Sequence, residues 1–235
     1  MKYNKMNVIP VIDLLHGQVV HAKLGDREHY LPIQSGLCAG SDPIAMVEAL
    51  LQLYPFTRLY IADLDAIQAL GGHHLLVADI SARYPQLEIW LDAGFTSSEA
   101  IQSWQGGRIR PVLGTESLSD LSHYQRLAQC CHQRHVLSLD FKAKQYQGPR
   151  ALIDSCEHWP PDVICMTLSQ VGSQAGPDIA QLATLKALSN THAIYAAGGI
   201  RNIEDLQQLT QNGIHGALIA SALHTGSIGH AELSV

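Results

Sequence analysis

Short apolar runs recur along the chain, and each is followed by a segment with helix-forming signals. Such alternation predicts a parallel sheet with helices packed against its strands. A chain of 235 residues with eight strand–helix units has the usual size of a single-domain (β/α)8 barrel. A doubly wound open sheet is the alternative, but no GxGxxG follows the first run. The expected strands are Asn7–Ile12, Arg58–Ala62, Leu87–Leu91, Ile109–Leu113, His135–Leu139, Asp162–Met166, Ala193–Ala196 and Ala217–Ala220.

Capping residues and early prolines mark helix starts between these runs. Ser41-Asp42-Pro43 predicts one start, because it supplies a capping side chain and an early proline. Thr96 with Glu99 has the spacing of a capping box. Further helices are expected from Pro149 to Trp159, from Pro177 to Leu188, between Asn202 and Gly213, and, as a short eighth helix, near Gly229 to Leu233.

Two expected strands in similar sequence segments are each followed by an aspartate. Asp13 follows the apolar run of NVIPVIDLLHGQVVHAK, where Gly17 marks a turn, and Asp140 follows that of HVLSLDFKAKQYQG. A carboxylate at the end of a buried strand is costly unless it is hydrogen-bonded, solvated or protonated. Across a barrel mouth, one such group can take a proton from a ligand while the other donates one. We expect Asp13 and Asp140 to be catalytic; the alternative is that one of them caps a loop.

The two halves of the chain resemble each other. DAGFTSSEAI (residues 92–101) aligns with AGGIRNIEDL (197–206), and LGTESL (113–118) aligns with IASALH (219–224) at nearly the same offset. Together with the two aspartate segments, these blocks predict a single domain over residues 1–235 that is built from half-barrels of about 1–120 and 121–235. Chance similarity among strand–turn–helix units is the alternative.

Small residues follow the seventh and eighth expected strands, at Gly198 and Gly199 and at Ala220 and Ser221. Loops at these places in barrels commonly bind phosphate through exposed backbone N–H groups, and glycine permits a close approach because it has no Cβ. We expect a phosphorylated small molecule to bind here. Tight turns that bind no ligand are the alternative.

An equivalent pocket is expected in the first half, from Gly94, Gly114 and Thr115. Two anion pockets on opposite sides of one mouth would suit a ligand with a phosphate at each end. Asp92 lies beside the first-half pocket and would repel an anion, which weakens this prediction.

Other polar residues are expected near the mouth. Asp63 ends the second strand, where lining the barrel, capping a loop and contacting a ligand are all open. Lys142 follows Asp140 by two residues; an ordinary ion pair is the favoured role, with anion binding and a Schiff base as alternatives. His21 and His224 are candidate ligand contacts.

The remaining features exclude several functions. Cysteine and histidine are densest from Cys130 to His135, but no second ligand pair is evident, so we expect no metal. A net charge of −6 without a basic stripe argues against nucleic acid. No signal peptide, membrane-length apolar stretch or CxxC is present, so we expect a reduced, cytoplasmic protein.

The irregular segment from Leu24 to Gly40 is expected to be a lid.

IPVIDLLHGQVV, YIADLDA, LGT, LSLD, AAGGI and the loop after the eighth strand resemble the HisA/HisF family of phosphoribosyl barrel enzymes over nearly the whole chain. The resemblance implies a barrel with a half-barrel repeat. By position, it implies that Asp13 and Asp140 are the acid–base pair of an Amadori rearrangement from aminoaldose to aminoketose. The isomerases of that family need no metal or organic cofactor.

The chain departs from the family pattern at several places. DAGFT stands where the family usually has GGG-I-R, and Ser221 stands where arginine is common. In the loop after the sixth strand, Val171 replaces the aspartate of the family's motif and Ser173, a candidate substrate or phosphate contact, replaces its threonine. VVHAKLGDREHY and LDFK are more similar to a related branch of methanogens and methylotrophs, which implies a link to methanopterin-dependent one-carbon metabolism.

Two hypotheses follow. The first is an isomerase-like acid–base enzyme on a phosphorylated, phosphoribosyl-type small molecule, which both aspartates favour. The second is a non-catalytic barrel that binds a phosphorylated metabolite, which Val171 and the altered first-half loop favour. The sequence identifies neither the substrate nor the oligomeric state.

Overall fold

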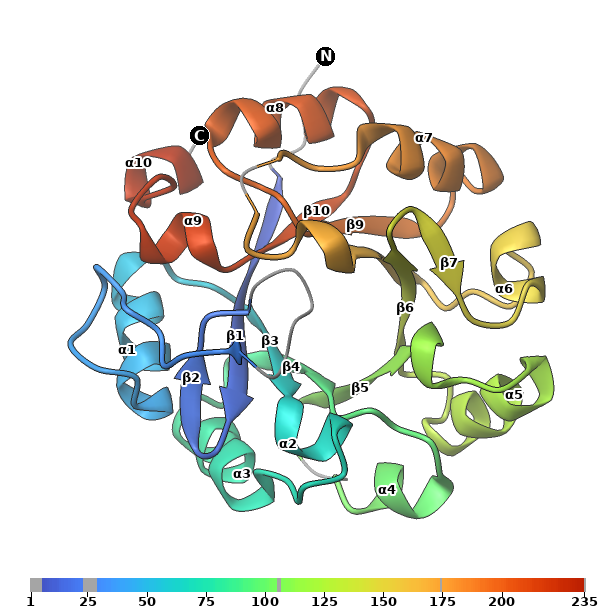
Figure 1. Ribbon diagram of the computed structural model, residues 1–235, viewed down its shortest axis with the longest axis horizontal. Helices are drawn as coiled ribbons and strands as arrows, with labels where there is room; N and C mark the ends of the chain where they lie inside the picture. Colours follow the sequence, from blue (N-terminus) through green and yellow to red (C-terminus); the bar gives the residue numbers. More distant parts are fainter. Residues whose placement is uncertain (1–5, 23–28, 105–106, 174, 235) are drawn as a thin grey trace.

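The computed structural model describes residues 6–22, 29–104, 107–173 and 175–234. Eight parallel strands form a closed ring, and helices surround it (Figure 1). Pairing of Asn7 with Gly216 and of Pro10 with Ile219 joins the first strand to the last and closes the ring. The predicted (β/α)8 barrel is confirmed. The ring strands are β1 (Asn7–Leu15), β3 (Arg58–Asp63), β4 (Glu88–Asp92), β5 (Ile109–Gly114), β6 (Val136–Lys142), β8 (Asp162–Thr167), β9 (Ala193–Ala197) and β10 (Gly216–Ile219).

Two antiparallel hairpins extend the ring at equivalent places. β2 (Gln18–Val20) folds back on β1, and β7 (Gln145–Gln147) folds back on β6. Each hairpin has a two-residue turn in which both residues have positive φ, 50° and 77° in the first and 50° and 64° in the second. Asp13 faces Val20 in one hairpin, and Asp140 faces Gln147 in the other. The two aspartates therefore occupy the same position in each hairpin, as the repeat predicts.

The helices follow most of the expected boundaries. Asp42 caps α1, and Asn202 caps α8. The helices are α1 (Pro43–Leu53), α2 (Leu64–Ile67), α3 (His74–Arg83), α4 (Ser98–Gln102), α5 (Leu121–Cys130), α6 (Ala151–Asp154), α7 (Ile179–Leu188), α8 (Ile203–Gln211), α9 (Ser221–His224) and α10 (His230–Leu233).

Two helix predictions were wrong in detail. The cap of α4 is Ser97 and not Thr96, because the Ser97 hydroxyl accepts the N–H of Ala100 at 3.2 Å. The helix expected from Pro149 to Trp159 is the single turn α6.

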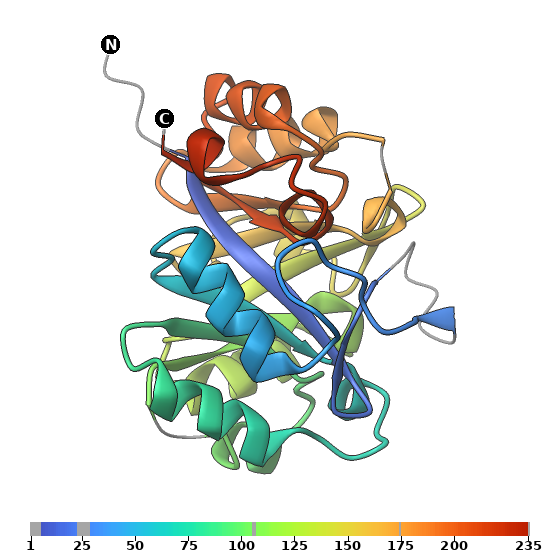
Figure 2. The same ribbon diagram turned by 90° about the vertical axis from the view of Figure 1, so that its left-hand side faces the viewer.

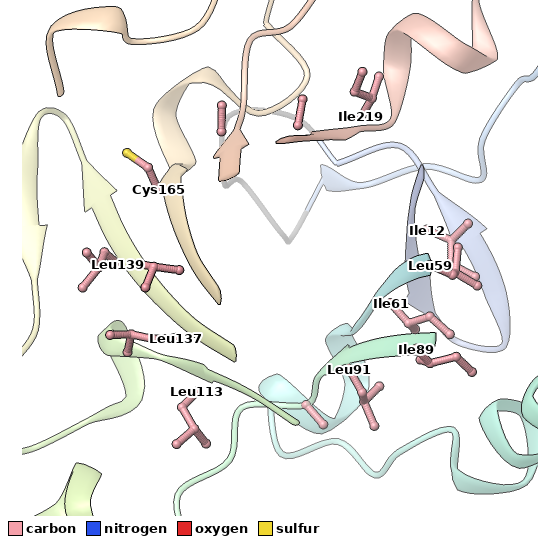
Figure 3. Packing of buried hydrophobic residues seen from close by; sticks show 14 of the residues in the cluster. Ile12, Leu59, Ile61, Ile89, Leu91, Leu113, Leu137, Leu139, Cys165 and Ile219 are labelled. Atoms are coloured by element: carbon pink, nitrogen blue, oxygen red, sulfur yellow. The ribbon is translucent and has the colours of Figure 1, made fainter. Parts of the chain in front are cut away.

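Alternate residues of each strand face opposite sides of the ring. Leu59 and Ile61 pack outward against the helices, whereas Tyr60 and Ala62 point into the barrel. Figure 3 shows the outward layer, and Figure 2 shows the helices that cover it. Its labelled members are Ile12, Leu59, Ile61, Ile89, Leu91, Leu113, Leu137, Leu139, Cys165 and Ile219.

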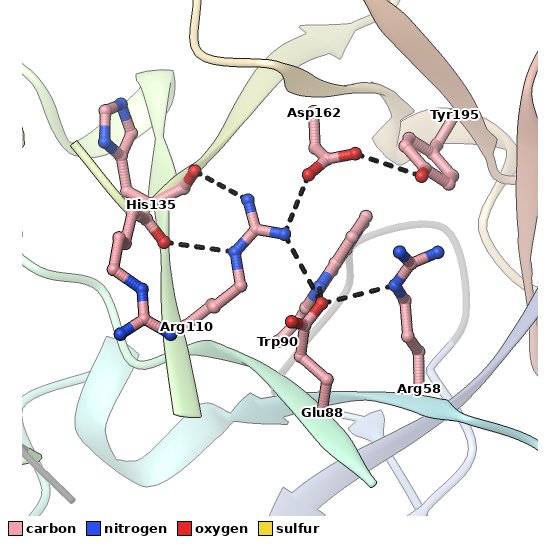
Figure 4. A network of polar contacts seen from close by, with 8 residues as sticks. Arg58, Glu88, Trp90, Arg110, His135, Asp162 and Tyr195 are labelled. Atoms are coloured by element: carbon pink, nitrogen blue, oxygen red, sulfur yellow. Dashed lines mark hydrogen bonds and ion pairs between the residues drawn. The ribbon is translucent and has the colours of Figure 1, made fainter. Parts of the chain in front are cut away.

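A network of charged side chains fills the amino-terminal end of the barrel (Figure 4). The Arg110 guanidinium pairs with Glu88 at 3.3 Å and with Asp162 at 2.7 Å. Arg58 and Arg110 also lie over the ring of Trp90, 5.6 and 5.5 Å from its centroid. Burial alone would raise the pKa of Glu88, but the hydrogen bond from Trp90 and the two guanidinium charges lower it. The network lies at the end of the barrel opposite the cavity described below.

Arg110→Leu would leave the carboxylates of Glu88 and Asp162 without this counter-charge. We expect the free energy of unfolding to fall by about 3 kcal/mol in urea denaturation, since breaking a largely buried ion pair is costly. Arg83→Leu is the control, because its ion pair with Asp79 is exposed and should contribute little. Equal stabilities of the two variants would contradict a structural role for the network.

Candidate active site

A cavity of about 170 Å³ opens at the carboxyl ends of the strands. Asp13 from β1 and Asp140 from β6 both line it, as do the loops after β8, β9 and β10. The wall combines apolar side chains from the barrel interior with carboxylates at the rim. The described residues that line it are Val11, Asp13, Ala22, Tyr30, Tyr60, Ala62, Leu64, Ile67, Asp92, Glu116, Asp140, Lys142, Met166, Leu168, Val171, Gly172, Ser173, Ala197, Gly198, Gly199, Ile200, Leu218, Ile219, Ala220 and Ser221.

Asp140 is held in one orientation by three neighbours. Its Oδ1 accepts the hydroxyl of Ser138 at 2.6 Å, and its Oδ2 accepts the N–H of Glu116 at 3.0 Å. The backbone N–H of Asp140 donates to the Thr115 hydroxyl at 2.9 Å. Burial raises the pKa of Asp140 to about 7, although the hydrogen bonds from Ser138 and Glu116 oppose the shift. A carboxyl with this pKa can carry a proton near neutral pH and donate it to a ligand.

Tyr60 lies among the carboxylates of the cavity wall. Its hydroxyl donates to Asp92 Oδ2 at 3.0 Å. Burial is the main cause that raises the pKa of Tyr60, followed by the charge of Asp92. The charges of Asp140 and Asp13 raise it further, so this phenol lies within the field of carboxylates from three strands.

The loops of the second half reach the cavity as expected. Gly198, Gly199, Ala220 and Ser221 all line it, and Ser173 lines it from the loop after β8. Gly198 and Gly199 have φ of 103° and 82°, and a Cβ at Gly198 would stand 2.7 Å from the Thr167 carbonyl oxygen. Glycine is therefore required for the close approach of these loops.

The three residues of the expected first-half pocket lie elsewhere. Gly94, Gly114 and Thr115 are not among the lining residues, and Thr115 is fully buried against Asp140. The N–H of Gly94 donates to Asp92 Oδ1 at 3.1 Å, and that of Glu116 donates to Asp140. The N–H groups of Gly94 and Glu116 donate to the protein's own carboxylates. Phosphate binding in the first half of the barrel stays a prediction.

Of the four remaining candidates, two lie near the mouth, Asp63 does not, and His224 contacts the segment expected to form a lid. Lys142 lines the cavity, and His21 contacts Ser221 Oγ at 3.2 Å through Nε2. Asp63 is fully buried outside the cavity wall, where it caps α2 by accepting the N–H of Ala66. It also contacts His73 Nδ1 at 2.7 Å, so its observed contacts are structural.

The segment expected to form a lid lies only partly within the described residues. Residues 24–28 fall outside them. Tyr30 lines the cavity, Pro32 forms a β-bridge with Val20, and the N–H of Gly36 donates to the His224 carbonyl at 2.8 Å. His224 itself is buried, and burial lowers its pKa to about 4. The described part of the segment is thus hydrogen-bonded to the barrel rim.

Sequence reasoning did not identify Tyr60 and Glu116 as lining residues and read Asp92 only as a source of repulsion. The signal for Tyr60 was its alternation with outward-facing Leu59 and Ile61.

Among the residues that the structure describes, no group of three or more His, Cys, Asp or Glu side chains is arranged to hold a metal ion. In the same ranges, no helix has the length and apolar character that a membrane span requires.

The fold and the site define a class: a (β/α)8 barrel in which two equivalent hairpins each carry one aspartate to a cavity at the carboxyl end. The family described as histidine biosynthesis protein matches residues 7–229. The chain belongs to this family, which comprises the HisA and HisF barrels, and the resemblance inferred from its motifs is confirmed.

Similar proteins extend over almost the whole chain. An uncharacterised protein of Methanocaldococcus jannaschii is 30% identical over 234 residues, 97% of each chain. A 1-(5-phosphoribosyl)-5-((5-phosphoribosylamino)methylideneamino)imidazole-4-carboxamide isomerase of Bacillus cereus is 25% identical over 241 residues, again 97% of each. The isomerase of that name from Chloroflexus aurantiacus is 26% identical, over 97% of this chain and 96% of its own.

The pKa of Asp140 can be measured directly. We expect its carboxyl carbon to titrate with a midpoint of about 7 in a carbon-detected NMR titration of the labelled protein. Ser138→Ala should raise the midpoint further, because the Ser138 hydroxyl stabilises the ionised form. A midpoint near 4 would contradict the buried environment described above.

Proposed function

We propose that the protein is a HisA-like isomerase that rearranges a phosphorylated, phosphoribosyl-type small molecule by acid–base catalysis. Asp13 is the general base and Asp140 the general acid. The observation that carries the proposal is that both aspartates, from equivalent hairpins, line one cavity, and that burial raises the pKa of one of them to about 7. Acid–base chemistry needs one group that donates a proton and another that accepts one.

The reaction consists of a ring opening and proton transfers, and it needs no external oxidant or reductant. Asp140 donates a proton to the ring oxygen of an aminoaldose, and the bond from that oxygen to C1 breaks to leave a protonated imine. Asp13 takes the proton from C2, which gives an enolamine. Return of a proton to C1 and loss of the proton on the C2 oxygen give the aminoketose. The atoms are conserved, and oxidation at C2 balances reduction at C1.

The phosphate of the substrate is assigned to the loops after β9 and β10. Gly198 and Gly199 allow a phosphate to approach the backbone, and Ala220, Ser221 and Ser173 lie on the same side of the cavity wall. Lys142 provides a positive charge at the rim. VVHAKLGDREHY and LDFK are similar to the branch of methanogens and methylotrophs, and on this similarity we place the reaction in one-carbon metabolism linked to methanopterin.

A second candidate is a barrel that binds a phosphorylated metabolite without turning it over. Val171 favours it, because this apolar side chain lines the cavity where the family pattern has an aspartate. Both candidates bind phosphate; turnover distinguishes them.

Asp13→Asn and Asp140→Asn each remove a proton-transfer group and change the shape of the site little. We expect each to lower turnover of an N-substituted 5-phosphoribosylamine by about a thousandfold or more and to leave phosphate affinity and cooperative thermal unfolding intact. Unchanged turnover in either variant would refute the assignment of that residue.

Growth of a histidine auxotroph that lacks the isomerase tests the substrate. Restored growth would place the enzyme in histidine biosynthesis. Absent growth, together with turnover of another phosphoribosylamine, would support the proposed role elsewhere. Phosphate binding with no turnover of any such compound would favour the binding protein.

The rate should depend on pH through Asp140. The acid form predominates below a pKa of about 7, so the rate should decline by about tenfold per pH unit well above pH 7. Ser138→Ala should move this decline to higher pH. A rate that is constant from pH 6 to 9 would contradict a protonated Asp140 as the acid.

A further inference from the structure

The turn of the first hairpin is bound to the neighbouring helices by two backbone N–H groups. The N–H of His16 donates to Asp65 Oδ2 at 3.1 Å, and the N–H of Gly17 donates to His73 Nε2 at 2.9 Å. Asp65 belongs to α2 and His73 directly precedes α3, so both side chains reach the turn from outside the hairpin (Figure 1). The same turn joins β2 to β1, the strand that carries Asp13.

The hydrogen bonds of His73 determine which of its ring nitrogens carries the proton. An N–H group can only donate, so Nε2, which accepts the N–H of Gly17, is the unprotonated nitrogen. Nδ1 therefore carries the proton and donates to Asp63 Oδ1 at 2.7 Å. Asp63 is fully buried and also accepts the backbone N–H groups of His73 and Ala66. The neutral ring is thus the form that holds the turn.

A second carboxylate faces the same nitrogen of His73. Asp65 Oδ2 lies 3.3 Å from Nε2. With Nε2 unprotonated, the two atoms present lone pairs to each other; with a proton on Nε2, they form a charge-assisted hydrogen bond. The other oxygen, Asp65 Oδ1, is buried and accepts no hydrogen bond from the residues that the structure describes. A positive charge on His73 would offset part of the cost of burying this carboxylate.

The titratable groups that face His73 come from β3, α2 and the hairpin turn; they are Asp63, Asp65 and His16. His16 Nδ1 lies 3.4 Å from Asp65 Oδ1, but the His16 side chain is 73% exposed, whereas that of His73 is 10% exposed. The next residue, His74, stacks on Trp104 with 3.8 Å between the ring centroids. His73 is therefore the histidine whose charge state decides the contacts of the turn.

We propose that His73 is a positioning residue that makes the hairpin of Asp13 sensitive to pH. The neutral ring accepts the N–H of Gly17 and holds the turn. The protonated ring donates from Nε2 to Asp65 and releases that N–H to solvent, which the exposed position of Gly17 allows. The pairing of Asp13 with Val20 then loses the support of a fixed turn. An effect on turnover rests on the proposed function; release of the turn does not.

Amide hydrogen exchange tests the release of the turn. Imidazole changes its charge near neutral pH, so exchange is compared by NMR at about pH 8 and about pH 5.5, corrected for the intrinsic rates. Protection of the Gly17 N–H should be about fivefold lower at the acid pH, the loss of one hydrogen bond. The His16 N–H, which Asp65 accepts in both forms, should keep its protection. Equal protection of Gly17 at both pH values, or a proton on His73 Nε2 at the higher pH, would overturn the inference.

Matched variants assign the effect to His73. His73→Gln supplies an amide oxygen that does not titrate, so Gly17 protection should be the same at both pH values. Asp65→Asn keeps an acceptor for His16 and removes the charge that favours the protonated ring, so release should require a lower pH. His16→Asn, which tolerates the φ of 50°, should leave the release unchanged. A release that persists in His73→Gln or disappears in His16→Asn would refute the role of His73.

The effect on catalysis is measured separately. Between about pH 7 and about pH 5.5, kcat for an N-substituted 5-phosphoribosylamine should decline more steeply in the wild-type protein than in His73→Gln. KM should be similar in both, because the proposed phosphate loops lie at the other end of the cavity from this hairpin. Identical declines would refute the coupling to Asp13. If the wild-type protein turned over no such compound, the proposed function would fail, and Gly17 protection would still decide whether the switch exists.

Discussion

Parallel pairing between β1 and β10 closes the ring of strands, and the arrangement of the mouth depends on this closure. Gly216 lies at the seam, where a Cβ would overlap the carbonyl oxygen of Asn7 and the ring of Tyr195. β1 continues past its last partner in β10 and carries Asp13 to the rim, where β2 and β3 pair with it. A closed ring leaves the loops at its carboxyl end as the place where groups from all strands can converge.

Much of this architecture could be predicted from the sequence, because short apolar runs and helix caps are local signals. The expected strands agree with the observed ones to within one to three residues at each end. β7 had no such signal, since its turn uses Ala143 and Lys144 with positive φ in place of the glycine or asparagine that usually marks a hairpin. Ser97 and Thr96 are both good caps, so composition alone did not distinguish them.

The candidate site was predictable where single residues decide its chemistry. Asp13 and Asp140 were evident as carboxylates that end apolar strands. The roles of Gly94, Gly114 and Thr115 were not, because a glycine in a turn has the same sequence signal whether its N–H faces a ligand or a neighbouring carboxylate. The raised pKa of Asp140 likewise arises from packing of the whole barrel around it.

The hairpins have a consequence for how this scaffold can diversify. Each aspartate is fixed by strand pairing on both sides: Asp13 by β2 and β3, and Asp140 by β7 and β8. The span between Asp13 and Asp140 is therefore set by the circumference of the barrel, and changes in loop length leave it constant. A new substrate range on this barrel has to evolve through changes in the loops at its carboxyl end, because the distance between Asp13 and Asp140 stays constant. In the proposed reaction, the two aspartates would therefore keep a constant spacing around the reacting carbon atoms, while the loops at the two ends of the ligand can change.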